Sequence, residues 1–391
     1  MKLARCMSRL GTETAFEVLV RARALEAQGR DVIHLEIGEP DFDTPSNIVE
    51  AAIEALRRGE THYTPSAGIL PLREAIAEEV GRMRGITISP DEVVVTPGAK
   101  PIIFFSLLAL AEPGDEVIYP NPGFPIYESM INFVGATPVP IPLREEREFR
   151  FDVDELRSKV TSRTRLIILN SPHNPTGGVL SREDLEAIAE LALQHDLMVL
   201  SDEVYSRILY EGEHVSVASF PGLKERTIIL DGFSKTYAMT GWRLGYGVMR
   251  TDLAACINRL MVNSASCTAA FTQWAGVEAL RGPQEAPARM VAAFRERRDA
   301  VVAGLRSIPG VTCVEPKGAF YVFPNITATG MPSKLFADSL LEKAGVAALS
   351  GTSFGAYGEG YVRLSYANSL ENLRRAVERI GDFITGFARN H

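Results

Sequence analysis

Residues 231–245 have the sequence DGFSKTYAMTGWRLG, which contains one lysine, Lys235. They follow the apolar, β-branched run TIIL at residues 227–230, a pattern typical of a buried strand. Lys235 is therefore predicted to lie on the turn at the carboxyl end of this strand, where open α/β sheets bind ligands. A single lysine is more often a solvated surface residue, so a functional role needs support from the rest of the chain.

The composition is typical of a soluble globular protein with more than one domain. The chain has 391 residues, and single hydrophobic cores stop growing at roughly 250 to 300 residues, so we expect two domains. Hydrophobic residues make up 46% of the chain and charged residues 23%. The net charge of -8 argues against a nucleic-acid partner, because a phosphate backbone calls for a basic surface.

The N-terminal residues do not resemble a signal peptide, and the cysteines are widely spaced; both features favour a cytoplasmic protein. Residues 1–9 are interrupted by charges and lack the apolar core of a signal peptide. The longest apolar run, residues 101–111, is too short to cross a bilayer, so no membrane partner is expected. Widely spaced cysteines without a C-x-x-C motif indicate isolated thiols and no structural metal; they are Cys6, Cys256, Cys267 and Cys313.

Short apolar runs alternate with helical stretches between residues 92 and 249. This alternation is typical of a mostly parallel sheet that helices cover on both faces. We therefore predict an α/β fold whose large domain contains a mostly parallel seven-stranded sheet between helices. The expected strands are residues 93–95, 117–119, 138–141, 166–170, 198–201, 228–230 and 244–248.

The two ends of the chain predict a smaller α+β domain. Near the N-terminus we expect helix 15–28, strand 32–37, a Gly/Pro/Asp hinge at 38–45, a helix that Ser46 caps, and helix 70–83. Near the C-terminus we expect helices 285–307, 332–343 and 369–387 and strands 311–314, 319–323 and 361–366. The resulting division is an N-terminal arm of residues 1–14, a small domain of 15–45 with 289–391, and a large domain of 46–288.

Several strand ends of the predicted large domain carry side chains suited to one ligand. Residues 96–101 (TPGAKP) open a helix, and free N–H groups at a helix N-terminus bind phosphate. Asn174 lies in a dense turn after a strand and can donate to a ligand oxygen. Asp202 also follows an apolar strand, where a buried carboxylate needs a cationic or hydrogen-bonding partner.

Lys235 and Arg243 complete this set. Arg243 is a planar cation suited to phosphate, and Lys235 can form a Schiff base with an aldehyde. Each residue by itself also fits a purely structural loop or surface position. One cofactor accounts for all of them together, because pyridoxal phosphate combines an aldehyde, a ring nitrogen that needs an acid, and a phosphate.

Residues 232–245 resemble the lysine signature of the class I/II aminotransferases, the aspartate aminotransferase-like enzymes of pyridoxal phosphate fold type I. The resemblance covers nearly the whole chain, and its motifs are highly specific as a set. The other matching segments are GEPDF at 38–42, the loop around Tyr63, NPTG at 174–177, DEVY at 202–205, GAFY at 318–321 and VRLSYA at 362–367.

The resemblance implies a catalytic role for Lys235, Asp202 and Tyr205. Lys235 is expected to hold the cofactor as an internal aldimine and, once substrate displaces it, to shuttle a proton between the substrate Cα and the cofactor C4′. Asp202 is expected to pair with the protonated pyridine nitrogen. Asn174 and Tyr205 are expected to hydrogen-bond the phenolic oxygen of the cofactor and thereby tune its pKa.

The same resemblance implies the remaining contacts to cofactor and substrate. Phe124 and Val204 are expected to cover the two faces of the ring, although ordinary core packing also suits them. Arg363 is expected to bind the substrate α-carboxylate bidentately, with Asn174 and Gly38 beside it, and glycine lets the backbone approach closely. The implied phosphate site comprises Gly98, Ala99, Lys100, Ser234 and Arg243, with Tyr63 reaching in from the neighbouring subunit of a homodimer.

Some positions depart from the family pattern. Gly232 stands where many relatives have a phosphate-binding serine, so another group has to supply that contact, and the roles of Ser234 and Lys100 stay open. His173 stands where a second asparagine is common and is interpreted as a loop residue. We identify no second arginine of the kind that aspartate-specific members use for the side-chain carboxylate, which leaves specificity for acidic substrates open.

We therefore predict a ping-pong aminotransferase that moves an amino group from an α-amino acid to a 2-oxo acid. Carbon-sulfur β-lyases and aminocyclopropane-carboxylate synthases share this cofactor and fold, so they are the nearest alternative. A regulatory protein that binds the cofactor without turnover is a more distant alternative. Such regulators carry an added DNA-binding domain, for which this chain has neither spare N-terminal length nor basic charge.

Overall fold

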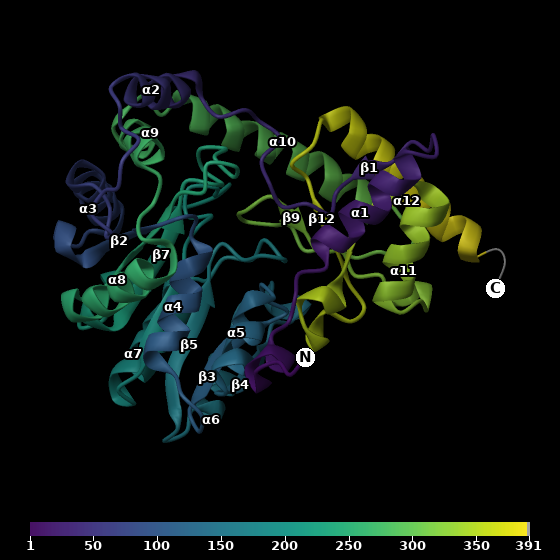
Figure 1. Ribbon diagram of the computed structural model, residues 1–391. Helices are drawn as coiled ribbons and strands as arrows, with labels where there is room; N and C mark the ends of the chain where they lie inside the picture. Colours follow the sequence, from purple (N-terminus) through teal and green to yellow (C-terminus); the bar gives the residue numbers. More distant parts are fainter. Residues whose placement is uncertain (389–391) are drawn as a thin grey trace.

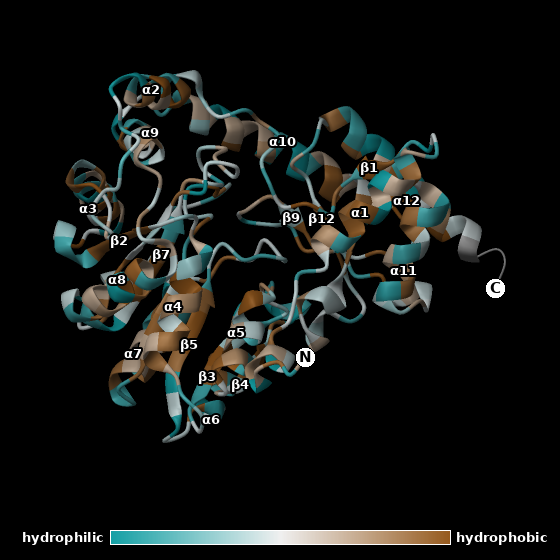
Figure 2. Ribbon diagram, in the orientation of Figure 1, coloured by the Kyte–Doolittle hydropathy of each residue, from teal (hydrophilic) through white to brown (hydrophobic). Residues whose placement is uncertain are grey.

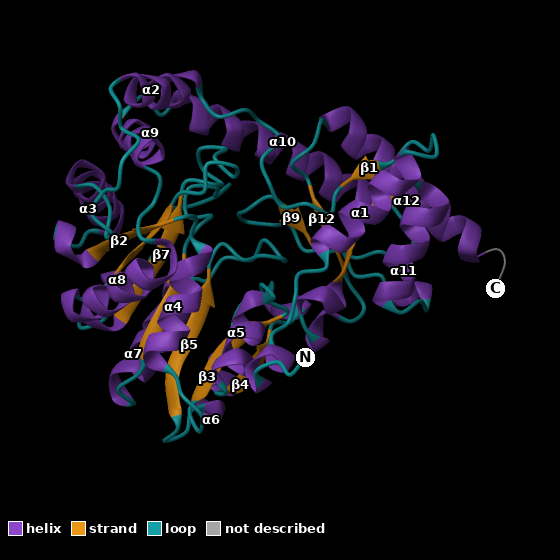
Figure 3. Cartoon of the chain, in the orientation of Figure 1, coloured by secondary structure: helices purple, strands orange, loops and turns teal. Residues whose placement is uncertain are grey.

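The computed structural model describes residues 1–388 and is organised around a seven-stranded sheet (Figure 1, Figure 3). Its strands are β2 Val93–Thr96, β3 Glu116–Asn121, β4 Thr137–Pro142, β5 Thr164–Asn170, β6 Met198–Asp202, β7 Thr227–Gly232 and β8 Gly245–Val248. They lie in the order β2-β8-β7-β6-β5-β3-β4. All neighbours pair in parallel except β8, which is antiparallel to both β2 and β7. The prediction of a mostly parallel seven-stranded sheet is confirmed.

Helices cover both faces of the sheet because its strands are apolar on both sides. In β5, Ile168 packs into one hydrophobic core and Ile167 into another, as the period of two along a strand requires. Figure 2 shows the middle parts of β3 and β5 coloured as hydrophobic. The covering helices are α4 Lys100–Leu110, α5 Ile126–Val134 and α8 Thr251–Ala265 on one face, and α3 Leu70–Arg84, α6 Val153–Lys159, α7 Arg182–Gln194 and α9 Ala270–Arg281 on the other.

A second group of elements joins the two ends of the chain (Figure 1). Near the N-terminus, β1 Ile33–His34 pairs in parallel with β10 Val346–Ala347. A three-stranded antiparallel sheet, β11-β12-β9, is formed by Leu349–Ser350, Val362–Ser365 and Tyr321–Val322. The helices of this second group are α1 Ala15–Glu26, α11 Ser333–Ser339 and α12 Leu370–Ala388. The long helix α10 Glu285–Arg306 runs toward them from α9 and from α2 Ser46–Arg57 (Figure 1).

Two predictions near the N-terminus are wrong in detail. The strand expected at 32–37 is shortened to β1, because the Glu36 carbonyl turns toward Arg363 and accepts a hydrogen bond from its guanidinium at 2.5 Å. Ser46 does not cap α2. The Pro45 carbonyl accepts from the Ile48 and Val49 amides, so Ser46 is already the first helical residue.

Two predictions near the C-terminus also differ from the structure. Residues 311–314 make an isolated bridge from Thr312 to Asn325 in place of the expected strand. The helix expected at 332–343 divides into α11 and a π-helical turn, Leu340–Ala344, which ends at Gly345 with a left-handed φ of 65°. Within residues 1–388, no helix is both long and apolar enough to cross a membrane.

Candidate active site

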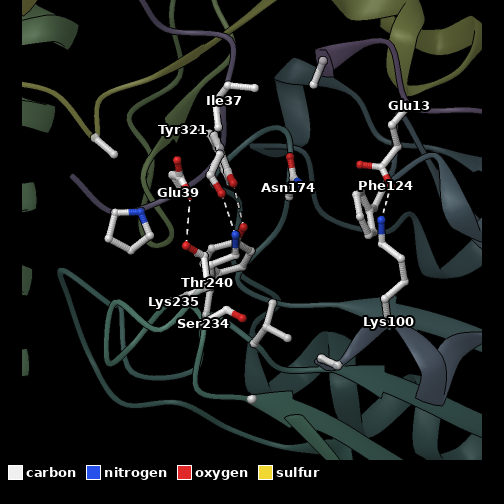
Figure 4. A pocket seen from close by; sticks show the side chains of 18 of the residues that line it. Glu13, Ile37, Glu39, Lys100, Phe124, Asn174, Ser234, Lys235, Thr240 and Tyr321 are labelled. Carbon is white, nitrogen blue, oxygen red and sulfur yellow. Dashed lines mark hydrogen bonds and ion pairs between the residues drawn. The ribbon is translucent and has the colours of Figure 1, made fainter. Parts of the chain in front are cut away.

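A cavity of about 990 Å³ opens at the carboxyl ends of β5, β6 and β7. Its walls come from the large sheet and from the elements that join the two chain ends. Figure 4 shows Lys235 below Tyr321 and Glu39, with Asn174 beside them. The predicted site residues that line the cavity are Gly38, Ala99, Lys100, Phe124, Asn174, Asp202, Val204, Tyr205, Ser234, Lys235, Arg243 and Arg363.

Lys235 lies on the turn after β7, as predicted. Its Nζ donates a hydrogen bond to the Gly38 carbonyl oxygen at 2.5 Å. Burial lowers the pKa of Lys235 to about 8; the charge of Glu39 opposes this shift, and the charge of Arg363 adds to it. The lower pKa increases the fraction of neutral amine, which is the form that attacks an aldehyde.

Asp202 is a buried carboxylate at the end of β6. The Tyr127 hydroxyl donates to its Oδ2 at 2.6 Å, and the Val204 amide donates to its Oδ1 at 3.4 Å. Burial raises the pKa of Asp202 to about 7, while the Tyr127 hydrogen bond lowers it. Such a carboxylate gains from a cationic partner on its cavity side, because an opposite charge stabilises its ionised form.

Backbone segments pack closely around the N-terminus of α4. Gly98 has a φ of 84°, and a Cβ at this position would lie 2.2 Å from Arg243 Nη2. Arg243 also donates to the Thr240 carbonyl oxygen at 2.8 Å. A Cβ at Gly232 would lie 3.2 Å from the Gly245 Cα, so the pairing of β7 with β8 favours glycine there. The site combines free backbone amides with a guanidinium, a set suited to phosphate.

Arg363 is buried in β12 and directed toward the cavity. Its Nη1 donates to Asn174 Oδ1 at 3.0 Å, and its guanidinium carbon lies 4.5 Å from the ring centroid of Tyr321. Nε is buried without a hydrogen-bond partner among residues 1–388. A buried guanidinium with an unused donor is suited to a carboxylate ligand.

The sequence and the fold both match characterised aminotransferases. A family model for aminotransferase class I and II matches residues 30–380. The chain belongs to this family. An aspartate aminotransferase of Pyrococcus horikoshii is 46% identical over 95% of this chain and 94% of the relative, and an aromatic-amino-acid aminotransferase of Thermococcus litoralis is 45% identical over 90% and 92%. The structure of an aspartate aminotransferase from Thermus thermophilus with maleate is 40% identical, covers 97% of this chain and 99% of its own, and has a TM-score of 0.93.

This aminotransferase depends on pyridoxal phosphate and works by a ping-pong mechanism, in which one amino acid leaves as a 2-oxo acid before a second 2-oxo acid takes up the nitrogen. The residues of the cavity fit that cofactor. Lys235 is a part-buried amine with a lowered pKa, and Asp202 is a buried acid without a cationic partner in the described chain. The glycine at position 98 leaves the Arg243 guanidinium room beside free amides.

Two predicted site residues do not line the cavity of the aminotransferase chain. Gly98 lies behind it, where its missing side chain makes space for Arg243. Tyr63 lies elsewhere on the surface of the same chain, and 89% of it is exposed. Tyr205 lines the cavity, and its hydroxyl lies 2.7 Å from that of Tyr321. A Cβ at Gly38 would lie 2.1 Å from the Tyr321 hydroxyl, which explains the close backbone approach predicted there.

Several side chains that shape this cavity have no role predicted from the sequence. Tyr127 bonds Asp202 from the first turn of α5, and its place shortly after Phe124 was the only available signal. Glu13 pairs with Lys100 from the N-terminal arm, for which no motif exists. His173 lies in the predicted loop, where Nδ1 is 2.8 Å from Thr176 Oγ1 and burial lowers its pKa to about 3.

Proposed function

We propose that Lys235 is the lysine that binds pyridoxal phosphate in this aminotransferase and that moves the proton during transamination. The observation that carries the proposal is the convergence of Lys235, Asp202 and Arg363 on one cavity. These side chains supply an amine, an acid and a carboxylate-binding cation. Bound pyridoxal phosphate supplies an aldehyde carbon for the substrate nitrogen and a ring that accepts electrons from the substrate Cα.

Each residue then has a separate task in the proposed reaction. The Lys235 amine takes the proton from the substrate Cα and returns it to the cofactor C4′. Asp202 holds a proton at the ring nitrogen, and its own hydrogen bond from Tyr127 keeps the carboxylate oriented. Tyr205 and Asn174 donate to the phenolic oxygen of the ring. Phe124 and Val204 enclose the ring and exclude water.

The proposed phosphate and carboxylate sites lie at different walls of the cavity. The phosphate is bound by the amides of Ala99 and Lys100, the hydroxyl of Ser234 and the guanidinium of Arg243. Gly98 leaves the Arg243 guanidinium room beside these amides. The substrate α-carboxylate binds Arg363, beside Asn174 and Gly38.

The substitution Lys235→Ala tests the central proposal. We expect the variant to lose the visible absorbance that pyridoxal phosphate acquires when the lysine binds it, and to lose turnover, because the other lysine that lines the cavity within residues 1–388, Lys100, is already paired with Glu13. Spectra of the purified variant and a transamination assay measure both. Normal transamination by this variant would contradict the assignment. Arg363→Ala serves as a comparison, since it is expected to raise the KM for amino acids and keep the absorbance.

A carbon-sulfur β-lyase or aminocyclopropane-carboxylate synthase-like reaction is the second candidate, because it would use the same lysine and cofactor. Incubation with one amino acid at a time separates the two. A transaminase stops after one equivalent of 2-oxo acid and waits for a second 2-oxo acid, whereas a lyase continues to release product. We expect the first outcome, in agreement with the named aminotransferase relatives.

We also propose that the protein is a homodimer in which Tyr63 contacts the phosphate bound by the partner subunit. Two observations support this arrangement. Tyr63 is 89% exposed on its own chain, and Leu70, at the start of α3, is 53% exposed. Large side chains left exposed in this way are typical of surfaces that another chain covers.

Two further assignments belong to the same proposal. In the proposed small domain of residues 15–45 with 289–391, a hydrophobic core joins Ile33 to Phe294, Phe320 and Ile384, and this core extends to Tyr205 and Ile208 of the proposed large domain. The large domain of 46–288 contains the cores on either face of the main sheet, and residues 1–14 form an arm. A cytoplasmic location agrees with the free thiols of all four cysteines, and cell fractionation tests it.

A further inference from the structure

One ion pair in the cavity is not used by the proposed reaction. Glu13, on the N-terminal arm, pairs through Oε1 with the Nζ of Lys100 at the start of α4. The Lys100 Nζ also lies 5.2 Å from the ring centroid of Phe124. Figure 4 shows Glu13, Lys100 and Phe124 together across the cavity from Lys235. The ammonium group of Lys100 is thereby directed into the cavity and already has an anionic partner.

The arm that carries Glu13 is fixed to the large sheet's helices. Arg9 Nη2 donates to the Phe133 carbonyl at 2.8 Å, and the Gly11 amide donates to Ser129 Oγ at 2.9 Å. Both acceptors belong to α5. Glu13 therefore enters the cavity from an anchored segment, and only 25% of its side chain is exposed.

The charge of Glu13 acts on the substrate-binding wall as well as on Lys100. Burial lowers the pKa of Arg363. The negative charge of Glu13 opposes this shift, and so do the charges of Tyr321, Tyr205 and Glu36. Burial likewise raises the pKa of Tyr321, and Glu13 adds to that shift. The charge of Glu13 therefore also acts on Arg363 and Tyr321, although Figure 4 draws Glu13 beside Lys100 and Phe124 and across the cavity from Lys235.

The charges that line the cavity leave few cations for a substrate side chain. Lys235, Arg243 and Arg363 have tasks in the proposed reaction. Among the described residues, the other lysine and arginine in the wall are Lys100, paired with Glu13, and Arg23, which is exposed. Apolar side chains also line the cavity, among them Phe16, Leu19, Ile37, Ile103 and Phe124.

We propose that Glu13 is a specificity residue: its carboxylate occupies Lys100 and thereby disfavours substrates that carry a second carboxylate relative to substrates with uncharged, apolar side chains. This inference rests on the proposed function. A dicarboxylic amino acid has to displace Glu13 or to place two carboxylates beside one ammonium group, and like charges at that separation repel. An apolar side chain meets no such competitor and packs against the apolar wall.

The substitution Glu13→Gln tests this inference on the holoenzyme. The measured quantity is the ratio of kcat/KM for aspartate to kcat/KM for phenylalanine. We expect this ratio to rise about fivefold, the effect of one partly exposed charge pair. The double variant Glu13→Gln/Lys100→Gln is expected to lose the gain, because it also lacks the cation that Glu13 releases.

A binding measurement complements the kinetics. Maleate is a dicarboxylate without an amino group, so its effect on the cofactor spectrum reports binding and not turnover. We expect Glu13→Gln to bind maleate about fivefold more tightly than the wild type. The matched control is Glu17→Gln, which removes an exposed carboxylate of α1 that lies outside the cavity wall. It is expected to leave both the ratio and the maleate affinity at wild-type values.

The outcomes separate this inference from the proposed function. If Lys235→Ala transaminates normally, the proposed function fails. If the wild type is an aminotransferase but Glu13→Gln matches Glu17→Gln in both measurements, the specificity role of Glu13 is overturned. A ratio that rises equally in Glu13→Gln and in the double variant would also overturn it, because Lys100 would then have no part in the effect.

Discussion

Two neighbouring acids at the end of β6 have opposite environments. Asp202 faces the cavity, and burial raises its pKa to about 7. Glu203 faces the opposite side, where burial raises its pKa but Arg84 and His214 lower it more, so that it falls well below its usual range. The Arg84 guanidinium lies 2.7 Å from Glu203 Oε2, and both side chains are buried. The first acid is therefore available for a ligand, whereas the second is already paired with Arg84 at the end of α3 and with His214.

The lowered pKa of Lys235 predicts how cofactor uptake depends on pH. In protein prepared without pyridoxal phosphate, only the neutral amine reacts with the aldehyde. With a pKa of about 8, roughly one tenth of Lys235 is neutral at pH 7 and most of it at pH 9. The rate of cofactor binding is therefore expected to rise about tenfold over this range and to level off above it. Stopped-flow absorbance measures this rate.

The variant Glu39→Gln is the matched test of that electrostatic account. Glu39 raises the pKa of Lys235, so its removal is expected to shift the midpoint of the pH profile to lower pH. The unaltered arginines keep their effect on Lys235. A wild-type midpoint near 10.5, the ordinary value for lysine, would contradict the role of burial.

At the scale of single elements, the N-terminus of α4 depends on one glycine. Gly98 has a φ of 84°, and a Cβ there would overlap Arg243. Gly98→Ala is expected to weaken pyridoxal phosphate binding about tenfold or more, because the guanidinium has to leave its place beside the amides. The variant is also expected to lose about 1 kcal/mol of unfolding free energy from backbone strain. Spectral titration and urea denaturation measure these two effects.

Gly59 provides the control for backbone strain alone. It follows α2 with a φ of 83°, and a Cβ there would meet no atom of the described chain within 4 Å. Gly59→Ala is expected to lose about the same unfolding free energy and to keep the wild-type cofactor affinity. Equal cofactor affinities in the two variants would show that Arg243 is not displaced.

The predictable elements are those whose signal lies within a short stretch of sequence. Each of the seven strands of the main sheet was expected, because short apolar runs between helical stretches mark buried strands. The strand ends then located Asn174, Asp202 and Lys235 correctly in one cavity. The short strands at the chain ends were harder to predict, since β1 and β10 pair only through contacts distant in sequence.

Other features of the site depend on contacts that no local pattern encodes. The arm brings Glu13 to Lys100 across the fold, and neither position carries a periodic or capping signal for that pair. The resemblance assigned Lys100 to the phosphate through its backbone and left its side chain without a stated partner. Tyr127 was likewise not assigned, because its hydrogen bond to Asp202 joins residues that are 75 positions apart in the sequence.

At the scale of the whole molecule, the proposed homodimer predicts that two defective chains can complement one another. Lys235→Ala removes the lysine of its own site, whereas Tyr63→Ala removes a phosphate contact from the site of the partner subunit. In a hybrid dimer of these two variants, both defects fall in the same site, because a two-fold interface is reciprocal. The other site retains its own Lys235 and receives an intact Tyr63.

Hybrid dimers isolated with two different affinity tags are therefore expected to have roughly half the wild-type activity at limiting pyridoxal phosphate. A hybrid of wild type and Lys235→Ala is the matched control and is expected to give the same value. If Tyr63 acted within its own chain, the remaining active site would carry the Tyr63→Ala defect, and the hybrid would have only half the activity of that variant. Because 89% of Tyr63 is exposed on its own chain, complementation is the expected result.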